Sequence, residues 1–347
     1  HGRRRIRRIR IGHGLHHDGR TTTDDDIADF NRHAFMSFNL NHRTLFIPAR
    51  LDLPAFFCNH RAIMMDANNS PEEISSGKDI AYENFPVGSW LLPARLRPHI
   101  ATFYHFARAA DDIADSAELG AEDKIARLVQ YEEAISGKLD NDTAPEKARR
   151  MAASLVETET TSQHCLDLLT AFKQDATKQR YQNWQELINY CQLSAAPVGR
   201  YLLNLHGGSK NGYDPSDALC VALQILNHLQ DCQDDYQTLD RVYLPLDMLE
   251  KHGAKLADLN ALETNLSLRQ VFDEILTGVD ELMLEAAKLP AGLKSRRLAM
   301  ESQIIINIAN RLSEKLRHND LLNNRLELSK PQYLACFITG AVQALFR

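Results

Sequence analysis

Carboxylate side chains recur at helical spacing in an apolar stretch of the chain near residue 110. The stretch reads IATFYHFARAADDIAD from residue 100 to residue 115. Four of its polar residues step by four, three and four positions, which places them on one face of a helix. A further carboxylate stands beside this face. The residues are Tyr104, Arg108, Asp111 and Asp115, with Asp112 as the neighbour.

A second acidic stretch further along the chain has a similar spacing. It reads ALCVALQILNHLQDCQDDY at 218–236, and its polar residues step by three, four and four positions. They again share one helix face, while Leu223, Leu226 and Leu229 are expected in the protein core. The polar residues are Gln224, Asn227, Asp231 and Asp235, with Asp234 beside them.

Two matching carboxylate faces favour a divalent cation site. Like charges four residues apart destabilise an isolated helix by roughly a few tenths of a kcal/mol, so a cation is expected nearby. Mg²⁺ suits these oxygen ligands, because it takes one or two carboxylates and completes its shell with water and phosphate oxygens. Either stretch alone could be a solvated helix face. A di-iron bundle needs Glu-x-x-His ligands, and neither stretch contains that motif.

The elements that must hold these residues are helices. Apolar residues recur three and four positions apart in eight segments, and alternating β-branched runs are absent. Turn-forming residues such as Gly207-Gly208 and Lys330-Pro331 separate them. The pattern predicts a single all-α domain. The expected helices are 91–115, 121–136, 146–174, 183–204, 215–238, 268–288, 296–318 and 330–346.

Small residues gather in the segment 183–204. Pro197 is expected to kink this helix, and the small side chains would leave room for a long apolar ligand. Close packing against another helix is the alternative explanation. The small residues are Ser194, Ala195, Ala196 and Gly199.

Composition divides the chain into two parts. Residues 1–63 contain 11 Arg and six Asp but neither Lys nor Glu, and seven of the 14 His. We expect 1–75 to be a poorly ordered or non-native N-terminal extension and 76–347 to be the helical domain. The overall charge of -6 argues against a nucleic-acid partner. Six scattered Cys without a CxxC pair favour a reducing, cytoplasmic location.

Three sequence blocks together resemble the squalene/phytoene synthase family. They are YHFARAADDIAD, YCQLSAAPVGRYL at 190–202 and LQILNHLQDCQDDYQTLDRVYLP at 223–245. The resemblance covers roughly residues 80–345 and implies the all-α isoprenoid synthase fold, a helical bundle with a central cavity. With ENFPVGSWLLPARLRPHI at 83–100, it is most similar to the family's hydroxysqualene synthase branch, from bacterial hopanoid biosynthesis.

The resemblance implies a role for each polar residue. Asp111, Asp115, Asp231 and Asp235 would hold two or three Mg²⁺ ions with the substrate diphosphate, and we add the flanking Asp112 and Asp234 to this set. The expected catalytic residues are Tyr104, Arg108 and Tyr243, and the expected substrate-binding residues are Arg108, Gln224, Asn227 and Arg241. One position departs from the family pattern. Many relatives carry Arg just before the second aspartate motif, whereas this chain has Gln230.

The implied reaction is Mg²⁺-dependent ionisation of presqualene diphosphate, with water capture giving hydroxysqualene and diphosphate. Because no Gly-rich dinucleotide turn occurs, no NADPH is expected. Two alternatives stay open. One is head-to-head condensation of two prenyl diphosphates to squalene, presqualene diphosphate or phytoene. The other is a non-catalytic isoprenoid-binding or assembly subunit.

Lipid substrates raise the question of membranes and partners. The apolar segment YLACFITGAVQALFR at 333–347 is too short to span a bilayer, and core packing or peripheral membrane contact would explain it. An isoprenoid diphosphate is the expected ligand, and coupling to other squalene-pathway enzymes is a further expectation.

Overall fold

The computed structural model describes residues 91–345 except residues 141 and 209 and residues 323–324. The predicted extension at 1–75 lies outside the described residues, so its boundary stays a prediction.

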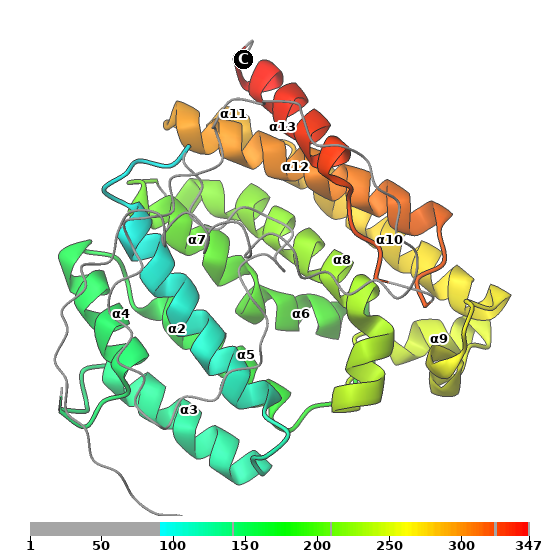
Figure 1. Cartoon of the computed structure of the whole chain (residues 1–347), viewed down its shortest axis with the longest axis horizontal. Helices are drawn as coiled ribbons and strands as arrows, with labels where there is room; N and C mark the ends of the chain where they lie inside the picture. Colours follow the sequence, from blue (N-terminus) through cyan, green and yellow to red (C-terminus); the bar gives the residue numbers. More distant parts are fainter. Residues whose placement is uncertain (1–90, 141, 209, 323–324, 346–347) are drawn as a thin grey trace, which may run out of the picture. The chain divides into compact units, whose positions relative to one another are not determined.

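Within the described residues the chain is helical and contains no named strand, as predicted (Figure 1). The long helix α8 lies next to α6, α7, α10 and α12, while α2 packs on α3, α4 and α5. The helices are α2 (Arg97–Asp115), α3 (Ala121–Ile135), α4 (Glu146–Glu157), α5 (Gln163–Asp175), α6 (Trp184–Ser194), α7 (Ala196–Leu205), α8 (Tyr213–Leu239), α9 (Leu246–His252), α10 (Leu266–Ala286), α11 (Leu289–Gly292), α12 (Arg296–His318) and α13 (Lys330–Leu345), with 3-10 turns η2 (Lys210–Gly212) and η3 (Leu256–Asn260).

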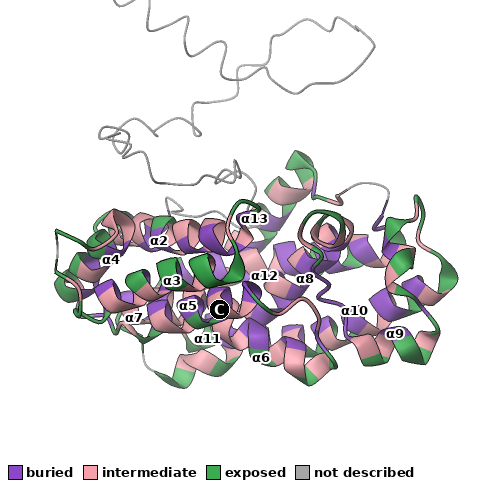
Figure 2. Ribbon diagram, turned by 90° about the horizontal axis from the view of Figure 1, so that it is seen from below, coloured by how far each residue is buried: buried purple, intermediate pink, exposed green. Residues whose placement is uncertain are grey.

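Helix α2 has the two faces that its sequence predicts. Pro98 lies in the first turn, where its missing N–H costs no intrahelical hydrogen bond. Phe106 and Ala110 are fully buried and Phe103 nearly so, whereas Asp111 and Asp115 are only half-buried. Buried and exposed residues likewise divide the other helices lengthwise (Figure 2). The apolar face therefore fixes the helix and leaves the acidic face for other contacts.

The predicted helix 146–174 is wrong, because two helices occupy this range. Helix α4 ends at Glu157 and α5 begins at Gln163. Glu159 adopts a left-handed conformation with φ 52°, and the Thr160 N–H donates to the Leu155 carbonyl at 3.0 Å. This is the usual way for a helix to terminate, but glycine normally fills the left-handed position. A glutamate there gives no signal in the sequence.

The segment 183–204 also consists of two helices, α6 and α7, and the break is next to Pro197. Ala195 has φ −121° and ψ −46°, outside the helical region. The Val198 N–H donates to the Ala195 carbonyl at 3.0 Å, a tighter turn than an α-helix makes. Proline has no N–H to continue the ladder, so the predicted kink is in fact a change of helix. The short α9 was not predicted.

The C-terminal helix α13 packs on α12. Among the described residues, no helix combines the length and apolar character needed to cross a membrane.

Candidate active site

The predicted site residues meet at one cavity of about 350 Å³. Its walls come from α2, α6, α7, α8 and α12, with apolar residues such as Phe103, Leu202 and Leu223 beside the polar ones. A second, more open groove involves α9 and α10 and contains none of the predicted residues. All but two of the predicted site residues line the cavity. Those that line it are Tyr104, Arg108, Asp111, Asp115, Gln224, Asn227, Asp231, Asp235, Arg241 and Tyr243.

Asp112 and Asp234 are the two exceptions. The Asp112 carboxylate lies 3.4 Å from Nε of Arg108 but does not line the cavity. Asp234 is exposed, and its carbonyl accepts a hydrogen bond from the Thr238 hydroxyl at 2.7 Å. Since a helix turns by about 100° per residue, the neighbour of a cavity-facing aspartate points elsewhere. Asp112 and Asp234 therefore lie outside the cavity lining, and their place in the metal-ligand set stays a prediction.

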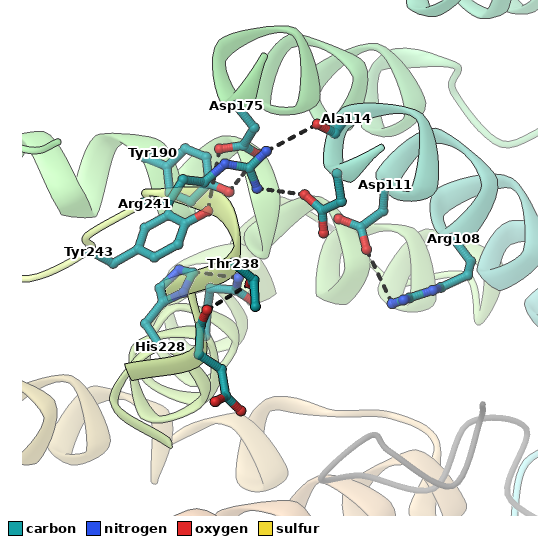
Figure 3. A network of polar contacts seen from close by, with 12 residues as sticks. Arg108, Asp111, Ala114, Asp175, Tyr190, His228, Thr238, Arg241 and Tyr243 are labelled. Carbon is teal, nitrogen blue, oxygen red and sulfur yellow. Dashed lines mark hydrogen bonds and ion pairs between the residues drawn. The ribbon is translucent and has the colours of Figure 1, made fainter. Parts of the chain in front are cut away.

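On the α2 wall, Arg108 Nη1 lies 3.1 Å from the Asp111 carboxylate, one turn along the helix (Figure 3). On the α8 wall, the Gln224 amide contacts His228 Nε2 at 3.3 Å. The two polar faces predicted from the sequence are thus both present and open into the same space.

Arg241 bridges the end of α8 to the end of α2. Its side chain is 7% exposed, with Nη1 2.5 Å from the Asp115 carboxylate and Nη2 donating to the Ala114 carbonyl at 3.1 Å (Figure 3). Asp240 turns the chain back with a left-handed φ of 50°. The Arg241 N–H then donates to the Asp235 carbonyl at 3.1 Å. Arg241, a predicted diphosphate contact, is thereby held in place by Asp115, a predicted metal ligand.

The segment after Arg241 is hydrogen-bonded along its backbone to the linker between α5 and α6. The N–H groups of Val242, Leu246 and Asp247 donate to the carbonyls of residues 179, 181 and 182 at 2.9, 2.9 and 3.0 Å. The linker and the segment 241–247 therefore hold each other in place behind the cavity.

Asp175 is a cavity residue that sequence reasoning missed. It is 3% exposed and accepts a hydrogen bond from the Tyr190 hydroxyl at 2.8 Å and from the Tyr243 hydroxyl at 3.5 Å (Figure 3). Burial raises the pKa of Asp175 to about 7. Only the fold brings Asp175 to Tyr243, which lies 68 residues away, so no local motif marks it.

His228 is a neutral member of the same group. Its ring stacks on Tyr243 with the centroids 3.6 Å apart, and burial lowers its pKa to about 3. The imidazole is therefore uncharged at neutral pH.

Arg325 is the second residue that the sequence did not reveal. Its Nε and Nη2 donate to the two carboxylate oxygens of Asp231 at 2.7 and 3.3 Å, and its side chain is 15% exposed. Gln230 donates from Nε2 to the carbonyl of Leu326, the next residue, at 2.5 Å. Position 230 thus carries no cation itself but contacts the segment that supplies one.

The donor set fits Mg²⁺ shared with a phosphate ligand. Among the described residues, no group of three or more His, Cys, Asp or Glu side chains could hold a metal by itself. Asp111 and Asp115 stand on one wall and Asp231 and Asp235 on the other. Mg²⁺ typically uses one or two carboxylates together with waters and substrate phosphates rather than an all-protein cage.

Small residues on α6 and α7 serve two purposes. A Cβ atom at Gly199 would lie 2.3 Å from Ser216 Oγ and 2.7 Å from Cys220 Sγ, so glycine permits the close contact of α7 and α8. Ser194, Ala195 and Gly199 also line the cavity. Close packing and space for a ligand, the two explanations for these residues, therefore both hold.

Comparison with known proteins gives a consistent result. The squalene/phytoene synthase family model matches residues 81–332. The hydroxysqualene synthase of Rhodopseudomonas palustris is 42% identical over 265 residues, which cover 76% of this chain and 90% of the relative. The hydroxysqualene synthase of Zymomonas mobilis is 35% identical over 291 residues, 83% of this chain and 97% of the relative.

Solved structures show the same fold. A squalene synthase from Alicyclobacillus acidocaldarius is similar with a TM-score of 0.58 and 29% identity, covering 67% of this chain and 86% of its own. A dehydrosqualene synthase matches with a TM-score of 0.64 and 20% identity, over 76% of this chain and 92% of its own, which supports the all-α terpenoid synthase fold. The chain is an enzyme of the squalene/phytoene synthase family, whose substrates are isoprenoid diphosphates.

Proposed function

We propose that the protein ionises presqualene diphosphate in an Mg²⁺-dependent reaction and captures the resulting carbocation with water, giving hydroxysqualene and diphosphate. The observation that carries this proposal is the cavity, where two carboxylate walls with arginines adjoin apolar residues. The names of the two relatives described above support the choice of product.

The polar end of the cavity suits a departing diphosphate. Arg108, Arg241 and Arg325 line it and supply positive charge and hydrogen-bond donors, which strengthen as the leaving oxygens gain charge. Asp111, Asp115, Asp231 and Asp235 would hold Mg²⁺, whose chemistry when bound is Lewis-acid stabilisation of the diphosphate.

The rest of the cavity suits a hydrocarbon cation. Phe103, Leu202 and Leu223 contribute apolar surface, which excludes bulk water from a reactive intermediate. Tyr104 also lines the cavity, and the face of an aromatic ring attracts a cation. We assign Tyr104 to cation stabilisation and Tyr243, which is held by His228 and Asp175, to shaping the polar end.

The test is incubation of the purified protein with presqualene diphosphate and Mg²⁺ in ¹⁸O-labelled water, with and without NADPH. We expect labelled hydroxysqualene and diphosphate in both cases, and loss of turnover when EDTA removes the metal. If the protein instead condenses two farnesyl diphosphates and does not turn over presqualene diphosphate, the alternative function, head-to-head condensation of prenyl diphosphates, is favoured.

A matched pair of variants on α8 tests the site itself. Asp231 lines the cavity and Asp234 is exposed on the same helix. We expect Asp231→Asn to lower kcat/KM by about 100-fold or more, because a carboxylate that would hold Mg²⁺ against the departing diphosphate is lost. Asp234→Asn should stay within about threefold of the parent, as surface substitutions usually do. Equal loss in both variants would contradict the assignment.

A further inference from the structure

The C-terminal end of α8 lies directly before Arg241 and concentrates negative charge. The last carbonyl groups of a helix have no intrahelical partner and carry partial negative charge, which a basic side chain nearby offsets. Helix α8 has no basic residue in its last turn, and Asp235 lies one turn before its end. Asp240 follows the helix with a left-handed φ of 50°, a conformation that strains most residues other than glycine. The turn that carries Arg241 therefore needs a cation from another part of the chain.

Arg180, in the linker between α5 and α6, supplies this cation. Its Nη2 lies 2.5 Å from the Asp240 carboxylate, and its Nη1 donates to the Asp240 carbonyl. Its guanidinium also lies over the ring of Tyr236 in the last turn of α8, 5.7 Å from the ring centroid. The planar guanidinium holds several donors in a fixed arrangement, unlike the single ammonium of a lysine. Three contacts from one side chain therefore hold the end of α8.

The residue on the other side of Arg241 is held by the same part of the linker. The Val242 N–H donates to the Gln179 carbonyl at 2.9 Å, and Arg180 Nη1 donates to that same carbonyl at 2.8 Å. Arg180 and Val242 also form an isolated parallel β-bridge. Both chain neighbours of Arg241 are therefore fixed by the residues 179–180.

This arrangement affects the cavity through the side chain of Arg241. Arg241 lines the cavity and extends to Asp115 and Ala114 on α2 (Figure 3). Arg180 is not among the residues that line the cavity. Any influence of Arg180 on a ligand in the cavity must therefore pass through the position of Arg241.

We propose that Arg180 is a positioning residue of the diphosphate site, which fixes the turn at Asp240 and thereby directs the Arg241 guanidinium toward Asp115 and the ligand. The inference rests on the proposed function, because it takes the polar end of the cavity as the place of the diphosphate. Asp240 is exposed, and an exposed ion pair by itself has little effect. The expected effect comes instead from the hydrogen bond to the Asp240 carbonyl and from the contacts on both sides of Arg241.

The test measures the binding of inorganic diphosphate in the presence of Mg²⁺ by calorimetry, together with kcat/KM for presqualene diphosphate. We expect Arg180→Met to weaken diphosphate binding and to lower kcat/KM, each by about five- to tenfold, the effect of one or two lost hydrogen bonds. Arg180→Lys keeps the charge without the planar arrangement of donors and should give a smaller fall. The control is Arg150→Met, which removes a surface arginine paired with Glu146 at 2.6 Å on α4 and should stay within about twofold of the parent.

A double-mutant comparison separates positioning from a general loss of stability. If Arg180 acts through Arg241, then Arg180→Met should change diphosphate binding by less than about twofold in a protein that already carries Arg241→Met. An equal fall with and without Arg241, or no fall in the single variant, overturns the proposal. Arg180→Lys takes the place of Arg180→Met in the same comparison if the latter does not fold.

The parent protein is the separate check on the proposed function. A parent that binds inorganic diphosphate but does not convert presqualene diphosphate contradicts the proposed function, whereas the binding comparison still decides whether Arg180 positions Arg241.

Discussion

Replacement of Arg325 tests whether a residue distant in sequence from both aspartate motifs helps to bind the diphosphate at the polar end of the cavity. Its guanidinium makes two hydrogen bonds to Asp231, at 2.7 and 3.3 Å, and is 15% exposed. In Arg325→Met the aliphatic volume is kept while the charge and the donors are lost. A charged hydrogen bond in such a setting contributes about 1.5–3 kcal/mol, so kcat/KM should fall about 10- to 150-fold.

Replacement of the neighbouring Gln230 should give a smaller fall in kcat/KM than replacement of Arg325. Its side chain donates to the Leu326 carbonyl at 2.5 Å and so positions Arg325 rather than contacting the ligand. Gln230→Leu removes that single hydrogen bond, worth about 1 kcal/mol, and kcat/KM should fall about fivefold.

The assay is steady-state diphosphate release from presqualene diphosphate. The control is Arg311→Met, which removes a surface arginine paired with Glu314 at 2.6 Å on α12. It should leave kcat/KM within about twofold of the parent, as expected for an exposed pair. A change of less than about threefold in Arg325→Met would refute the reasoning, because a cation at the leaving group must affect the barrier.

Two further predictions concern stability. Gly199→Ala should lower the free energy of unfolding by about 1–3 kcal/mol in chemical denaturation, because its Cβ would meet Ser216 Oγ at 2.3 Å, whereas Gly292→Ala, with no atom within 4 Å, should be nearly neutral. Burial raises the pKa of Asp175 from 3.8 to about 7 in the folded protein. Between these two pH values the folded protein keeps the Asp175 carboxyl protonated while the unfolded chain does not, so the free energy of unfolding falls as the pH rises from 3.8 to about 7. Relative to the parent, Asp175→Asn should therefore gain stability between about pH 4.5 and pH 7, and a constant difference between the two proteins across that range would contradict this account.

The sequence predicted the faces of α2 and α8 because those faces depend on local spacing. Asp111 and Asp115 on one helix, and Asp231 and Asp235 on the other, line the cavity as expected. Asp112, which we included among the expected metal ligands, directly follows a cavity-facing residue and does not line the cavity.

Long-range contacts could not be predicted in this way. Arg325 reaches Asp231 from 94 residues away, and only the packed structure shows that pairing. The division of 146–174 into two helices depends on the left-handed Glu159, a residue type that rarely marks a helix end.

The backbone pairing of the segment 241–247 with the α5–α6 linker has a consequence for local unfolding. Since Val242, Leu246 and Asp247 are tied to the linker, Arg241 and Tyr243 cannot leave the site one at a time. Their amide protons should exchange with solvent as one cooperative unit. An insertion in the linker would loosen the guanidinium and the phenol together, although it would touch neither directly.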